Sequence, residues 1–141
     1  MQQALTTFTI DTRGPGLVEI TDRVGRWLAD QSIGDGLLTV FCRHTSASLL
    51  VNENAAGAVR RDMEAYFARI APADPDAYEH DDEGLDDMPA HLRTALTGVS
   101  LAIPVLGGRL ALGTWQGVFL FEHRARPHRR QIVAHLIGEA D

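Results

Sequence analysis

The chain contains no lysine, because all thirteen of its basic residues are arginine. Without a lysine ammonium group, Schiff-base chemistry, covalent attachment of pyridoxal phosphate and a nucleotide-binding P-loop are excluded. Any anion that the protein binds must therefore be held by arginine, by backbone amides or by a metal ion.

Cysteine and long apolar runs are also scarce. Cys42 is the only cysteine, so no internal disulfide can form, as expected in a reducing cytoplasm. Apolar runs such as residues 118–121 are far shorter than the ~20 residues of a membrane helix, and the first residues lack the regions of a signal peptide. The net charge of −6 gives no reason to expect nonspecific nucleic-acid binding. We therefore expect a cytoplasmic protein with neither nucleic-acid nor membrane partners.

A length of 141 residues, 45% of them hydrophobic, fits one domain over residues 1–141. Alternating and β-branched patterns predict strands at residues 5–10, 17–20, 37–43, 48–51, 99–104, 109–112, 115–123 and 130–137. Helical spacing predicts three helices, over residues 21–31, 55–70 and 88–96. Because the helices interrupt the strands at only a few places, we predict an α+β fold with packed, largely antiparallel sheets.

Polar residues mark the ends of these predicted helices. Thr21 or Asp22 is predicted to cap the first helix, and Asn54 the second. Gly98 is predicted to end the third helix. Residues 71–87, which carry eight acidic residues and no arginine, are predicted to form a long connection without regular structure. Such an acidic connection is either a solvated loop or a place where magnesium meets substrate phosphates.

Six histidines are present, and His44, His80 and His91 lie in the least strand-like surroundings. Imidazoles together with carboxylates can bind zinc or another divalent ion. Their spacing matches no compact ligand motif, so partly buried, hydrogen-bonded histidines are the alternative that spacing alone favours.

Two further polar groups lie where they could contact a ligand. Asn52, Glu53 and Asn54 precede a predicted helix, whose free N–H groups favour anions. Trp115 and Gln116 lie between Gly113 and Gly117, where tryptophan could stack on a flat ring or simply fill the core. An arginine-rich segment that begins at Arg124 could face phosphate or form a solvated turn. Thr45 and Ser46 lack the surroundings of a serine nucleophile and are expected to make turns or contact a ligand.

Four segments in the same order resemble the YjbQ-like family, which is often described as secondary thiamine-phosphate synthase. They are HTSASL (44–49), NENA (52–55), DDMPAHL (86–92) and GRLALGTWQG (108–117). The resemblance implies an α+β fold, a homotrimer and sites near subunit contacts. It also implies a weak activity that joins hydroxymethylpyrimidine diphosphate to thiazole phosphate and releases pyrophosphate. Family members share histidines at the positions of His44, His80 and His91, which favours a common polar or metal site.

The resemblance and the residue patterns together define an expected site for a small phosphorylated substrate. The expected catalytic residues are His44, Glu53 and Gln116. The expected substrate-binding residues are Thr45, Ser46, Asn52, Asn54, Trp115 and Arg124. The expected ligands of a divalent metal, zinc or magnesium, are His44, His80 and His91. Two other functions remain open: a trimeric metal- or ligand-binding protein without a dedicated catalytic role, and a metal-dependent hydrolase.

Overall fold

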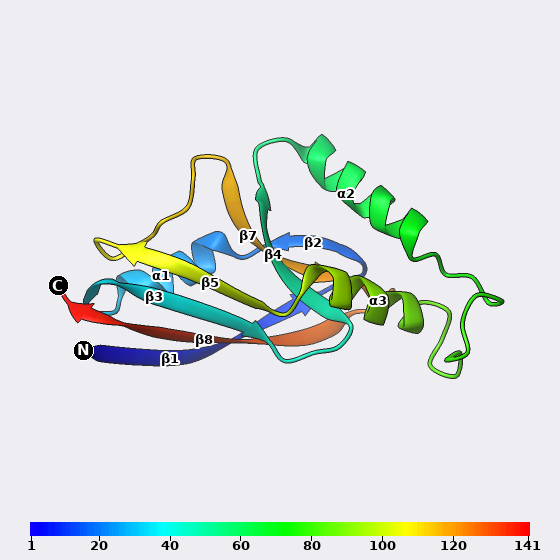
Figure 1. The fold of residues 1–141 in the computed structure, drawn as a ribbon, viewed down its shortest axis with the longest axis horizontal. Coiled ribbons are helices and arrows are strands. Elements are labelled where there is room, and N and C mark those ends of the chain that lie inside the picture. The colour runs from blue at the N-terminus through cyan, green and yellow to red at the C-terminus, as the bar shows by residue number, and fades with distance from the viewer.

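The computed structural model describes residues 1–141, which form two antiparallel sheets and three helices (Figure 1). The larger sheet has the strand order β1 (Gln2–Thr12), β8 (His128–Ala140), β3 (Ile33–Cys42), β5 (Ser100–Leu106) and β6 (Arg109–Leu110). The smaller sheet has the order β2 (Gly16–Glu19), β7 (Gln116–Glu122) and β4 (Ala47–Glu53). The helices are α1 (Thr21–Ala29), α2 (Gly57–Ile70) and α3 (Asp87–Thr97).

The main core contains side chains from both sheets and from α1. Alternate residues of β3 and β8, such as Leu38 and Leu136, are buried, whereas their neighbours along each strand are more exposed. They belong to one buried cluster with Leu49 of β4, Leu120 of β7 and Leu28 of α1. The period of two in the strands therefore determines which face of the larger sheet is buried.

Strand β7 is buried on both faces, because α2 packs on the side of the smaller sheet that faces away from the main core. Phe119 and Phe121 form a second cluster with Leu17 and with Phe67 of α2. The rings of Phe67 and Phe121 meet edge to face, with centroids 5.4 Å apart. This double burial explains the continuous apolar run before Glu122.

The predicted α+β fold is confirmed, with corrections at the ends of several elements. Helix α2 begins at Gly57, and the prediction that Asn54 caps it is wrong, because the Asn54 amide donates to Glu19 instead. The predicted cap of α1 is also wrong, since Thr21 is already helical and its hydroxyl donates to Glu19 as well.

The remaining elements follow the predictions to within a few residues. The strand predicted at residues 109–112 is only the short β6, and β7 begins one residue after Trp115. Residues 71–86 contain neither helix nor strand, and Gly98, with φ of 95°, ends α3 as predicted. None of the helices has the length and apolar character needed to cross a bilayer.

Candidate metal centre

His80, Asp87 and His91 meet where the acidic loop joins α3. Asp87 and His91 lie one helical turn apart and therefore on the same face of α3. His80 comes from the loop: its Nε2 lies 2.8 Å from Oδ2 of Asp87, and Nε2 of His91 lies 3.1 Å from the same oxygen. The three candidate ligand atoms all lie within 4.8 Å of one another, which suits a single bound ion.

The other nitrogen of each imidazole also faces an oxygen that can only accept. Nδ1 of His91 donates to the Thr45 carbonyl at 2.8 Å, so a neutral His91 carries its lone pair on Nε2. Nδ1 of His80 lies 3.3 Å from a carboxylate oxygen of Asp82, which favours the same tautomer. Outer partners of this kind orient metal-binding histidines in proteins.

The electrostatics of the cluster favour a positive charge. Burial works to raise the pKa of Asp87, but the His80 hydrogen bond and the charges of His91 and Arg124 hold it below its ordinary value. The hydrogen bond to Asp87 raises the pKa of His80. Because both Nε2 atoms point at one carboxylate oxygen, the cluster needs protons or a cation between these groups.

The donor set decides which cation fits. Two imidazole nitrogens and one carboxylate oxygen form a set that proteins use for catalytic zinc, with a further coordination position left open. Magnesium prefers an all-oxygen shell, which this cluster does not offer. The residues therefore fit zinc or a similar transition metal better than magnesium.

Arg124 borders the cluster, and its three guanidinium nitrogens all have protein acceptors. Nε donates to Asp86 at 2.9 Å, Nη1 to Oδ1 of Asp87 at 2.6 Å and Nη2 to the Glu83 carbonyl at 3.0 Å. Its side chain is 18% exposed. The guanidinium thus faces the acidic loop and the first turn of α3. From the sequence, a contact with phosphate and a solvated turn were both open for this segment.

A cavity of about 560 Å³ lies beside His91 and is large enough for a small molecule. Thr45, His44, Phe41 and Val99 contribute to its walls. His44 is not part of the three-residue cluster, because its Nε2 accepts the backbone N–H of Gln131 at 2.8 Å. Burial, together with the charge of Arg130, holds the pKa of His44 below its ordinary value, so its imidazole is neutral at pH 7. His44 therefore lies on the wall of the cavity next to the cluster.

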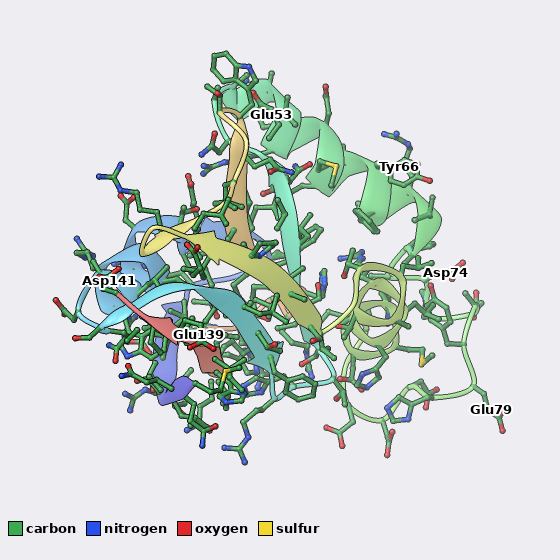
Figure 2. All side chains as sticks on the ribbon, turned by 60° about the vertical axis from the view of Figure 1, so that its left-hand side comes forward. Glu53, Tyr66, Asp74, Glu79, Glu139 and Asp141 are labelled. Carbon is green, nitrogen blue, oxygen red and sulfur yellow. The ribbon has the colours of Figure 1, made fainter.

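The opposite end of β4 carries five of the expected site residues: Asn52, Glu53 and Asn54, with Trp115 and Gln116 beside them. Thr45 and Ser46 precede this strand, and Asn52 and Glu53 end it. Seven residues of extended chain separate these ends by about 20 Å. Figure 2 shows Glu53 far from Asp74 and Glu79 of the acidic loop. Within one chain, the expected residues thus form two groups.

The second group is engaged in local structure. The Glu53 carboxylate accepts the N–H of Ala56, where an anion was expected, and the Asn54 amide donates to Glu19. Gln116 accepts the N–H of Gly113, and the Trp115 side chain is 64% exposed, so it does not fill the core. The amide nitrogen of Asn52 is buried without a partner.

Ser46, which follows Thr45 of the cavity wall, belongs to a buried polar network. Its hydroxyl accepts a hydrogen bond at 3.0 Å from Arg130, and Arg130 also forms an ion pair with the fully buried Glu122. Arg130 belongs to the arginine-rich segment that could face phosphate, and its pairing with Glu122 was not predicted. Asp87 was also not predicted as a ligand, although its four-residue spacing to His91 was a usable signal.

Comparison with known proteins agrees with the motifs. Residues 6–139 match the family described as UPF0047 protein YjbQ-like. UPF0047 protein sll1880 of Synechocystis sp. is 50% identical over 130 residues, which cover 92% of this chain and 88% of that protein. UPF0047 protein YjbQ of Escherichia coli O157:H7 is 46% identical over 134 residues, covering 94% and 96%. None of these names states a reaction.

Solved structures show the same fold. The conserved hypothetical protein TT1486 of Thermus thermophilus is 36% identical, with a TM-score of 0.84 over 94% of this chain and 99% of that one. Hypothetical protein APE1520 of Aeropyrum pernix K1 is 31% identical, with a TM-score of 0.88 over 96% and 99%. The chain therefore belongs to the UPF0047 YjbQ-like family.

Proposed function

We propose that this protein binds one divalent metal ion, zinc by preference, at His80, Asp87 and His91, and acts there on a small phosphorylated substrate. The convergence of two imidazole nitrogens on one carboxylate oxygen, with an outer acceptor behind each imidazole, is the observation that carries the proposal. The adjoining cavity of about 560 Å³ provides space for the substrate.

The reaction that we propose is that of a thiamine-phosphate synthase, as the resemblance to the family suggests. The thiazole nitrogen attacks the pyrimidine methylene, the C–O bond breaks and pyrophosphate leaves with the bonding electrons. When bound, the metal ion would offset the negative charge that develops on the leaving group. The nucleophile has no proton to lose, so no general base is needed.

The residues around the cavity have distinct tasks in this proposal. A neutral His44, whose Nε2 already accepts a backbone N–H, carries its proton on Nδ1 and can donate it to a phosphate oxygen. Thr45 fixes the His91 ring through its carbonyl. The apolar part of the wall, including Phe41 and Val99, would hold the flat pyrimidine ring.

A metal-dependent hydrolase is the second candidate. The observation that favours it is the set of three convergent donor atoms, which on a zinc ion would leave one position for a water molecule. Metal content and turnover separate the candidates. The purified protein is assayed with the two thiamine precursors and, separately, with simple phosphate esters. Turnover of the precursors alone supports the synthase, and turnover of the esters alone supports the hydrolase. Stoichiometric zinc with neither activity supports a binding protein.

Matched variants test whether the centre carries the activity. His91→Ala and Asp87→Asn should lose the metal and the activity together, whereas His44→Ala should lose activity but retain the metal. Asp30→Asn is the control, because this exposed residue follows α1, which lies at the other side of the molecule from α3 (Figure 1). A His91→Ala variant that folds normally and keeps its metal and its turnover would remove the centre from the mechanism.

We also propose that the protein acts as a homotrimer, with the uncovered face of the larger sheet as the contact. Leu37 and Phe41 of β3 and Ile137 of β8 are 41%, 45% and 38% exposed on this face, where an apolar side chain gains from burial. Phe41 also lines the cavity, so a neighbouring chain would lie beside the site. Sedimentation should give three times the chain mass, and Leu37→Glu should reduce it.

A further inference from the structure

Arg124 contacts the candidate centre without being able to bind a metal ion. Its Nη1 donates to Oδ1 of Asp87 at 2.6 Å, while the two histidines face Oδ2 of the same carboxylate. The Asp87 side chain is only 6% exposed, so the arginine is its main partner on the Oδ1 side. Oδ1 of Asp87 is thus held by Arg124, and Oδ2 faces the two histidines, where a metal ion would bind.

We infer that Arg124 is a positioning residue that keeps Asp87 a one-oxygen ligand and so preserves an open coordination position. A carboxylate can bind a metal through one oxygen or through both. With Oδ1 held by a guanidinium, Asp87 offers Oδ2 alone, and His80, Asp87 and His91 supply three ligand atoms in total. A fourth position then remains for substrate. This inference rests on the proposed metal-dependent function.

The same guanidinium positions the loop that carries His80. Nη2 donates to the Glu83 carbonyl, and Nε donates to the Asp86 carboxylate, which also accepts the N–H of Ala125. Because His80 precedes Glu83 by three residues, Arg124 fixes the loop close to the point where His80 meets Asp87. A planar fork with donors on every nitrogen can make these contacts together, and a lysine ammonium cannot.

Charge and geometry predict opposite effects of Arg124 on metal binding. A guanidinium beside a bound cation repels it, so removal of that charge by itself would tighten metal binding. Loss of an outer partner that orients a ligand weakens binding by ~10–100-fold. The direction of the change in affinity therefore reports which role Arg124 has.

The test compares Arg124→Gln and Arg124→Lys with the wild-type chain. The apo proteins are titrated with zinc in competition with a chromophoric chelator, and cobalt is then added for visible absorption spectra. Both variants should bind zinc ~10–100-fold more weakly. Their cobalt absorption should also fall, because a second Asp87 oxygen raises the coordination number and four-coordinate cobalt absorbs most strongly. A purely structural role would leave the spectrum of the bound fraction unchanged.

Arg129→Gln is the matched control, because Arg129 is 79% exposed and pairs with Asp11 away from the cluster. It should bind zinc as the wild type does. If Arg124→Gln binds zinc at least as tightly as the wild type and gives the wild-type cobalt spectrum, the inference is overturned and the proposed function stays intact. A wild-type chain that binds neither zinc nor cobalt would remove both.

Discussion

Arg130 and Glu122 form a forked ion pair inside the protein, with Nε and Nη2 of the arginine donating to the two carboxylate oxygens at 2.8 and 2.5 Å. Their side chains are 4% and 0% exposed. Thr12 also donates to Glu122 at 2.6 Å, so β1, β7 and β8 are joined at one point. Arg130 also donates to the carbonyl and the hydroxyl of Ser46, which directly precedes β4, so the pair supports the segment that carries Thr45.

Arg130→Met should lower the free energy of unfolding by about 3–5 kcal/mol, because it leaves a buried carboxylate without its partner. Urea denaturation followed by circular dichroism measures this loss. The double variant Glu122→Leu/Arg130→Met should recover a large part of it, since no charge is then left buried. A double variant as unstable as the single one would show that packing, rather than the charge, accounts for the loss.

The stability of the protein should fall as the pH drops below about 6.5, and His123 should be one cause. Burial, together with the charge of Arg93, lowers the pKa of His123 from 6.5 to about 3. The unfolded chain therefore binds a proton between these values and the folded chain does not, so stability is complete above pH 6.5 and declines toward pH 3. The contribution of His123 is on the order of 5 kcal/mol at most.

His123→Gln isolates this effect, because a glutamine can still meet the Ser48 hydroxyl that now lies 2.9 Å from Nε2 of His123. The variant should have a flatter curve of unfolding free energy between pH 6.5 and 4.5. Below that range Glu122 still contributes: burial works to raise its pKa, but hydrogen bonds from Arg130 and Thr12 hold it low. Unchanged slopes above pH 4.5 would show that His123 is not the group responsible.

Cys42 should be unreactive in the folded protein. Its side chain is buried, and burial raises the pKa of the thiol to about 11, so almost no thiolate exists at pH 8. In buffer, an aromatic disulfide that reacts with free thiols should modify less than one equivalent of Cys42 over an hour, as measured by the aromatic thiol that it releases. The same reagent should release one equivalent at once in guanidinium, which serves as the control. Rapid modification in buffer would indicate that β3 opens near the cavity.

Gly36→Ala should destabilise the protein by about 1–3 kcal/mol or more, because a Cβ atom at this position would overlap the carbonyl oxygen of Ile137 on β8. Gly25→Ala is the control: it lies within α1 with no atom near its Cβ position, and it should stabilise by about 0.5–1 kcal/mol. Equal melting temperatures for both variants would contradict the close approach of β3 and β8.

Much of the fold could be predicted from the sequence because its patterns are local. The period of two in β3 and β8 and the helical spacing in α3 each identify an element without knowledge of its neighbours. The helix caps were harder to predict. Asn54 and Thr21 have the right side chains for capping, but Glu19, distant from Asn54 in sequence, accepts hydrogen bonds from both.

The candidate site was predicted only in part because it depends on which ends of strands meet. His80 and His91 stood out in the sequence, whereas Asp87 was one of eight acidic residues in the segment 71–87. Its four-residue spacing to His91 is the one local signal that distinguishes it, and the helix predicted at residues 88–96 began one residue too late to include it. Strand β4 also separates Thr45 from Glu53. No pattern in the sequence shows that the two ends of this strand have different surroundings.

The acidic loop, residues 71–86, has a consequence for proteolysis. It has no regular structure, and most of its residues are exposed. Its contacts with the rest of the chain include the His80–Asp87 pair and the hydrogen bonds of Arg124. If the proposed metal ion is bound at His80, a chelator that removes it should therefore make this segment the first place where a protease cuts. One fragment would carry β1–β4 with α1 and α2, and the other would carry α3 with β5–β8, so a gel would report metal occupancy.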